Sequence, residues 1–230
     1  MHEWWPDEID YAGPEHLDDA YVAGYDAKAQ FDPTDDITAL VARDMDHAAR
    51  VVDLGAGTGT FTLAVAPEVA SVIAVDPSPA MAAIIRRRVS AAELDNVTVV
   101  EGGFLTYRHA GAPADAVYTR NALHQLPDFW KAMALQRLHD LMGKGSILYL
   151  RDLVYDFAPA DATDTLEAWM AGAADDPARG YTASDLAHHV RTEFSTFSWV
   201  LEAMLERTGF TIEERTFGRN IYAAYICRRR

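Results

Sequence analysis

The sequence predicts an α/β fold with a doubly wound parallel sheet. Between residues 50 and 151, short apolar runs typical of buried strands alternate with longer helical patterns. The first run leads into three glycines at alternate positions, Gly55, Gly57 and Gly59. The second run, residues 72–75, ends in an acid, Asp76. A strand, a glycine turn, a helix and an acid-tipped strand build a nucleotide-type pocket at the carboxyl edge of a parallel sheet.

The expected elements can be followed in order along the chain. Two helical segments, residues 15–29 and 34–49, precede the first strand. The core then offers strands over residues 50–54, 72–76, 97–101, 114–119 and 146–151. Helices connect them over residues 59–69, from Pro79 onwards behind a Ser78 cap, and over 128–142. Beyond residue 151 we expect helices over 161–174, 182–190 and 194–207, and then an antiparallel strand pair over 210–217 and 221–228.

Length, composition and charge indicate a single globular domain that acts on small molecules. The chain has 230 residues, half of them hydrophobic, which suits one domain with a substantial core. Its net charge of −15 argues against DNA and disfavours RNA, because phosphate backbones are bound largely through Lys and Arg. No apolar run reaches membrane-spanning length, and the acidic start does not resemble a secretory signal. Cys227 is the only cysteine, so no disulfide can form within the chain. Together these features lead us to expect a cytoplasmic protein without a membrane partner.

The spacing of the glycines distinguishes between two kinds of cofactor. A dinucleotide fingerprint reads G-x-G-x-x-G, but here the third glycine comes one position early, and Thr60 stands where the last glycine belongs. From Asp53 to Gly59 the chain reads D-x-G-x-G-x-G, which resembles motif I of the class I S-adenosylmethionine (SAM) methyltransferases. The resemblance covers residues 37–228 and is sharpest over 50–151. It implies a Rossmann-like seven-stranded sheet of order 3-2-1-4-5-7-6, with SAM as cofactor and S-adenosylhomocysteine (SAH) as product.

The resemblance also implies one methyltransferase domain, residues 1–230, made of four parts. We expect a helical N-terminal cover over residues 1–49, a SAM-binding core over 50–151, a helical insertion over 152–193, and a C-terminal helix and strand pair over 194–230. The cover and the insertion would enclose the substrate.

The same resemblance gives cofactor-binding roles to several residues. Asp76 would hold the ribose of SAM, Asp53 would orient its amino group, and the three glycines would lie against the methionine part. Met81 would pack on the adenine ring, although its place in a helix stripe fits a core residue equally well. Tyr25, with Tyr21 one turn earlier, would form a lid over the cofactor or simply pack.

The segment after the third strand departs from the family pattern. Residues 101–105 read E-G-G-F-L and resemble a G-D-F-L segment whose acid meets the adenine amino group. Gly103 stands where that acid is expected, so the usual adenine contact is missing. The backbone N–H of Phe104 could still bond the ring.

The segment after the fourth strand carries the candidate catalytic residue. Residues 121–127 read N-A-L-H-Q-L-P and resemble the family's N-x-L-H-H-L-P segment, which lines the pocket below the sulfonium. Asn121 would offer its backbone carbonyl to the SAM amino group. His124 is a candidate general base, because the pKa of histidine lies near the working pH, or it only shapes the pocket. Arg151, Asp152 and Tyr155 leave the fifth strand on the substrate side.

Other catalytic chemistries lack their motifs. No H-E-x-x-H, C-x-x-C or G-x-S-x-G pattern occurs, so we expect neither a catalytic metal nor a Ser or Cys nucleophile. Adjacent histidines such as His188 and His189 point to different faces of a helix and do not easily share one metal ion.

The sequence therefore favours a SAM-dependent methyltransferase with a small-molecule acceptor. The alternatives are an RNA or protein methyltransferase, a non-catalytic SAM-binding regulatory protein, and a nicotinamide dinucleotide enzyme, which the glycine spacing disfavours. The identity of the acceptor and the methylated atom stay open at this point, because fold does not fix substrate.

Overall fold

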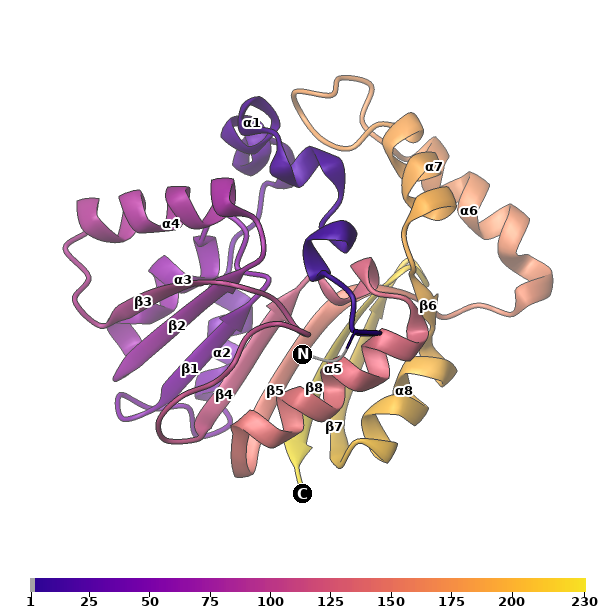
Figure 1. Ribbon diagram of the computed structural model, residues 1–230. Helices are drawn as coiled ribbons and strands as arrows, with labels where there is room; N and C mark the ends of the chain where they lie inside the picture. Colours follow the sequence, from indigo (N-terminus) through magenta and orange to yellow (C-terminus); the bar gives the residue numbers. More distant parts are fainter. Residues whose placement is uncertain (1–2) are drawn as a thin grey trace.

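A single mixed sheet forms the centre of the molecule (Figure 1). The computed structural model describes residues 3–230, without the side chains of Pro14, Glu15, Asp19, Ala20, Tyr21 and Ala23. The strands run in the order β3-β2-β1-β4-β5-β8-β7. Their bounds are β1 (Arg50–Leu54), β2 (Ser71–Asp76), β3 (Val97–Glu101), β4 (Ala114–Arg120), β5 (Met142–Tyr155), β7 (Phe210–Gly218) and β8 (Tyr222–Arg229).

The expected strand order is confirmed. Strands β3 to β5 pair in parallel, whereas β8 is antiparallel to both β5 and β7. A two-residue strand, β6 (Thr196–Phe197), pairs with the end of β5 but is not part of this strand order. Because β6 is counted, the two final strands are β7 and β8 rather than the sixth and seventh. The central strands β1 and β4 are buried almost throughout, because helices cover both faces of the sheet, whereas the edge strand β3 is only partly buried.

Two hydrophobic clusters hold the helices against the sheet. On one face, α5 (Asp128–Leu141) and α8 (Ser198–Arg207) pack through Leu135, Leu138, Leu201 and Leu205. On the other, α2 (Thr34–Val41) and α3 (Thr60–Val65) pack through Leu40, Phe61 and Val65. The 3-10 turn η3 (Ala66–Glu68) extends α3. Each cluster buries its side chains almost completely, so the sheet is a rigid support for the loops at its edge.

Helix α4 (Pro79–Ala91) connects β2 to β3 and packs against both strands. The remaining helices lie above the carboxyl edge of the parallel strands, where Figure 1 shows α1 (Asp19–Ala29) on one side and α6 (Ala162–Ala171) and α7 (Ala183–Thr192) on the other. The N-terminal turns η1 (Glu8–Tyr11) and η2 (Pro14–Leu17), and the later turns η4 (Leu123–Gln125) and η5 (Pro159–Asp161), complete the described elements. No helix within residues 3–230 has the length and apolar character needed to cross a membrane.

Several caps and boundaries match the expectation. The Ser78 hydroxyl caps α4 by accepting a hydrogen bond from the Met81 N–H at 3.2 Å, and Pro79 begins the helix. Thr182 and Asp185 form a capping box at the start of α7.

Other boundaries differ for tertiary reasons. The helix expected over residues 34–49 ends at Val41, and Asp44 adopts φ +72° in the turn that follows. Strand β5 continues beyond residue 151, because β8 and β6 supply partners up to Tyr155. The helix expected over 194–207 begins only at Ser198, because Thr196 and Phe197 join β5.

Candidate active site

The glycine loop makes a tight turn between β1 and α3. All three glycines have positive φ, between +57° and +84°. A Cβ on Gly55 would lie 2.4 Å from the Cβ of Ala122, so no other residue fits there. Gly57 faces Tyr25, whereas Gly59 packs against Ile85 of α4 and supports the loop from behind.

The Asp76 carboxylate lies beside this loop at the tip of β2. One oxygen accepts a hydrogen bond from the Gly57 N–H at 2.8 Å, and the other accepts one from the Ser78 N–H at 2.9 Å. A carboxylate has about four acceptor positions, so both oxygens can still accept bonds from ribose hydroxyls. Burial raises the pKa of Asp76 to about 6 despite these two hydrogen bonds.

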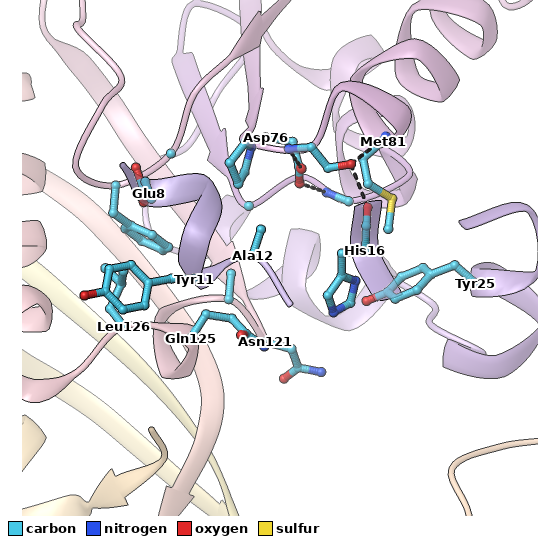
Figure 2. Close-up of a pocket in the computed structure, with 17 residues that line it drawn as sticks. Glu8, Tyr11, Ala12, His16, Tyr25, Asp76, Met81, Asn121, Gln125 and Leu126 are labelled. Atoms are coloured by element: carbon cyan, nitrogen blue, oxygen red, sulfur yellow. Dashed lines mark hydrogen bonds between the residues drawn. The ribbon is translucent and has the colours of Figure 1, made fainter. Parts of the chain in front are cut away.

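A cavity of about 80 Å³, which we call the central cavity, opens in front of Asp76 (Figure 2). Most of the residues predicted to bind the cofactor line it, namely Tyr25, Gly55, Gly57, Asp76, Met81, Gly103, Phe104 and Asn121. The N-terminal segment closes it with Glu8, Tyr11, Ala12 and His16. Three predicted site residues, Asp53, Gly59 and His124, do not line this cavity.

Glu8 fills the space left by the missing acid at position 103. A Cβ on Gly103 would lie 2.5 Å from the Glu8 carboxylate. That carboxylate accepts hydrogen bonds from the N–H groups of Leu105 (2.8 Å) and Thr106 (3.0 Å) and from the Thr106 hydroxyl (2.9 Å). Glu8 is buried, and burial raises its pKa although these hydrogen bonds oppose the shift. Sequence reasoning missed Glu8, because only the gap at Gly103 signalled that another group was needed.

A second cavity, of about 280 Å³, lies on the other side of the glycine loop, and we call it the loop-side cavity. Asp53 lines it and is buried, with one carboxylate oxygen accepting a hydrogen bond from the Thr62 hydroxyl at 2.5 Å. Burial raises the pKa of Asp53 to about 7. Arg120 lines the same cavity, and its buried Nε has no hydrogen-bond partner among the described residues. A buried unpaired donor is costly, so Arg120 is poised to bind an anionic group.

The third cavity, of about 390 Å³, extends below Asn121 towards α7, and we call it the histidine-side cavity. His124 lines it together with His189 and Glu193. The Nε2 of His124 lies 2.8 Å from Glu193 Oε2, and its Nδ1 bonds the Asp152 carboxylate. Neither nitrogen of His124 is therefore available to accept a proton in this arrangement.

The charges around His124 also affect its protonation. Burial alone would lower the pKa of His124, but the carboxylates of Asp152 and Glu193 outweigh burial and raise it to about 9. Burial would raise the pKa of Glu193, but hydrogen bonds from His124 and His189 hold it well below its usual range. In this state His124 is an imidazolium between two carboxylates.

The three cavities are neighbours that share lining residues. Tyr25 lines all three of them, Gly55 and Gly57 lie between the central and loop-side cavities, and Asn121 lies between the central and histidine-side cavities. Figure 2 shows Asn121, His16 and Tyr25 at this junction. Tyr21, the other predicted lid residue, falls outside the described side chains.

Comparisons with known proteins agree with this fold. Residues 51–145 match the family of methyltransferase domains. An uncharacterized methyltransferase of Anoxybacillus flavithermus is 26% identical over 206 residues, which is 89% of each chain.

Solved structures share the fold at low sequence identity. A SAM-dependent methyltransferase from Aquifex aeolicus superposes with a TM-score of 0.63 at 15% identity, over 93% of this chain and 99% of that one. Magnesium protoporphyrin IX methyltransferase from Synechocystis PCC 6803, solved with bound SAH, gives 0.61 at 14% identity, over 97% and 93%.

Sequence, strand order and glycine loop lead to one assignment. The D-x-G-x-G-x-G turn and the acid at the tip of β2 stand on a sheet of the family's order, and the matched domain covers both. Over residues 51–145 the chain matches the methyltransferase domain family, and its sheet has the fold of a SAM-dependent methyltransferase.

Proposed function

We propose that the protein transfers the methyl group of SAM to a small-molecule acceptor held in the histidine-side cavity. The observation that carries this proposal is the set of three neighbouring cavities that share Tyr25, the glycine loop and Asn121 as lining residues. The central cavity then suits the adenosine part of SAM, the loop-side cavity its methionine part, and the histidine-side cavity the acceptor.

The adenosine part of SAM fits the central cavity. Asp76 accepts hydrogen bonds from the ribose hydroxyls, and Met81 and Phe104 offer apolar contact to the adenine ring. Glu8 takes the place of the acid that Gly103 lacks and faces the adenine amino group. At about 80 Å³ this cavity is far smaller than typical ligand pockets of roughly 300–1,000 Å³, so the N-terminal segment must shift as the cofactor enters.

The methionine part of SAM fits the loop-side cavity. Asp53, once ionised, suits the positively charged amino group, and Arg120 carries the positive charge suited to the carboxylate. Opposite charges in one buried cavity match a zwitterion better than they match a nicotinamide ring.

The acceptor fits the histidine-side cavity. Its volume of about 390 Å³ suits a small molecule, and α6 and α7 contribute Trp169, Leu186 and His189 to its lining. The net charge of −15 further disfavours RNA as acceptor. Transfer is a direct displacement: the acceptor atom bonds the methyl carbon, the C–S bond breaks, and its electron pair stays on the sulfur of SAH. Alignment of the acceptor supplies much of the rate in such a displacement.

Calorimetric titration with SAM, SAH and NAD tests the cofactor assignment. We expect micromolar binding of SAM and SAH and no binding of NAD. The Asp76→Ala variant should bind SAM tenfold or more weakly, because each lost hydrogen bond to an ionised acceptor costs roughly 1.5–3 kcal/mol. Asp95→Ala, which changes an exposed acid beyond α4, is the matched control and should bind normally.

A screen with methyl-labelled SAM then tests the acceptor class. Label appearing in a small-molecule pool supports the proposal, whereas label appearing only in RNA or protein contradicts it. Equal SAM affinities for the wild type and Asp76→Ala would overturn the assigned cofactor orientation.

A further inference from the structure

Two histidines and a glutamate meet on one wall of the histidine-side cavity. His124 comes from η4 after β4, His189 from α7, and Glu193 directly follows α7. Glu193 Oε2 lies 2.8 Å from His124 Nε2 and 2.7 Å from His189 Nδ1. One ligand atom from each residue lies within 4.8 Å of the others, which is a spacing that a single metal ion can bridge.

The other nitrogen of each histidine is fixed by a second partner. Nδ1 of His124 bonds Asp152, whose carboxylate also accepts hydrogen bonds from the N–H groups of His124 (2.9 Å) and Leu153 (2.8 Å). Nε2 of His189 lies 2.8 Å from the Ser195 hydroxyl. Histidines that bind metals usually carry such a partner, because it sets the tautomer and aims the free nitrogen at the ion. Both rings here are oriented with one nitrogen towards a common point.

We propose that His124, His189 and Glu193 bind a divalent transition-metal ion in the acceptor cavity. Two imidazoles and one carboxylate suit ions such as Zn²⁺, Co²⁺ and Ni²⁺, and three protein ligands leave coordination positions open. Binding requires a small outward movement of the Glu193 carboxylate and releases the protons that it now shares with the two rings.

The adjacent histidines His188 and His189 do not together form this site. The structure confirms that these two diverge, since His188 is exposed and His189 is buried. The second imidazole comes instead from His124, which lies in a different segment of the chain.

The ion gives the proposed methyl transfer a defined acceptor chemistry, and this step rests on the proposed function. A hydroxyl of the acceptor at an open position would lose its proton to solvent more readily, because the cation would stabilise the anionic oxygen. That oxygen would then bond the methyl carbon of SAM as the C–S bond breaks and its electron pair stays on the sulfur. The acceptor class is accordingly a hydroxylated small molecule.

Cobalt titration of the full-length, chelator-treated protein tests the site. We expect visible absorption typical of bound Co²⁺, saturating at one ion per chain and reversed by Zn²⁺. His189→Gln and Glu193→Gln should each weaken binding at least about 100-fold, and Asp152→Asn should weaken it by about 10–100-fold. His188→Gln changes the exposed neighbour on the same helix and should leave the affinity unchanged.

Two results would overturn the proposal: no stoichiometric Co²⁺ binding by the wild type, or binding that neither His189→Gln nor Glu193→Gln weakens. If those variants do not fold, X-ray absorption spectroscopy of the zinc-loaded wild type identifies the ligands of the ion instead. Two imidazole ligands and an oxygen ligand are expected, and any other set contradicts the site. SAM calorimetry on the same samples keeps the two proposals separate, because a protein that binds cobalt but not SAM refutes only the proposed function.

Discussion

At the scale of single residues, the proposed cofactor binding depends most directly on Asp76. Its carboxylate is buried beside the glycine loop, and burial raises its pKa to about 6. The ribose hydroxyls are donors, so they bind the ionised carboxylate better than the protonated acid. The neighbouring Glu8 charge also contributes to the raised pKa.

SAM affinity should therefore fall as the pH drops through about 6. Above this pH Asp76 is ionised in the free protein and the affinity is at its full value. Below it, protonation competes with SAM, and the affinity falls by up to about tenfold per pH unit. Calorimetry of the wild type and of Asp76→Asn between pH 5 and 8 measures the difference. The same slope for both proteins would assign the pH dependence to another group.

Among single residues, the sequence alone predicts proximity when the residues belong to neighbouring segments. The glycines and Asp76 lie in one strand–turn–helix–strand unit, so their spacing in the sequence was enough to predict that they lie together. Glu8, Arg120 and the pairing of His124 with His189 depend on segments that meet only in the folded chain. Arg120 could have been suspected from its position at the tip of β4, directly before Asn121.

Among the elements, the short helix α2 is fixed to the sheet by one buried acid. The Asp36 carboxylate accepts hydrogen bonds from the hydroxyls of Tyr118 (2.7 Å) and Tyr149 (2.8 Å) and from Arg151 (2.9 Å). Asp36 is only 1% exposed, so these bonds replace nearly all of its contact with water. The network joins the N-terminal cover to β4 and β5.

Asp36→Ala should lower the free energy of unfolding by about 3 kcal/mol or more, because three donors lose a buried charged acceptor. Urea denaturation measures the change. Asp35→Ala removes the exposed acid next to it on α2 and should cost well under half as much. Equal losses for the two variants would show that Asp36 does not anchor the helix.

Element boundaries show what periodicity can and cannot predict. The caps of α4 and α7 were predictable, because a capping side chain lies within three residues of its partner. The extension of β5 to Tyr155 was not, because its partners Tyr222 and Phe197 lie far along the chain. The end of α2 at Val41 was not predicted, because apolar residues continue at helical spacing beyond it. Two of these residues, Met45 and Ala49, do enter the core, but they do so from the turn after the helix.

For the whole molecule, the N-terminal segment decides how the cofactor cavity is closed. Glu8 is held by Leu105 and Thr106, and the His16 carbonyl accepts a hydrogen bond from the Ser78 hydroxyl at 2.7 Å. Trp5 adds a hydrogen bond from its indole N–H to the Leu105 carbonyl at 3.2 Å. These contacts place the segment across the carboxyl edge of the sheet.

Removal of residues 1–17 should weaken SAM binding at least tenfold, mainly through faster dissociation, because one wall of the central cavity is lost. Stopped-flow measurement of SAM binding tests this, and thermal unfolding should stay cooperative, since the two main clusters consist mostly of later residues. Glu8→Gln separates the loss of one charge from the loss of the whole segment. Tighter binding by the truncated protein would instead identify the segment as an obstruction.

The position of Glu8 also affects the order in which segments of the chain fold during synthesis. Its hydrogen-bond partners, Leu105 and Thr106, lie 97 and 98 residues further along the chain. While the ribosome is still adding β1, β2 and β3, the segment that will cover their tips has already emerged and has nowhere to dock. This early-made segment is thus among the last to reach its place, and a nascent chain exposes its glycine loop before the segment can cover it.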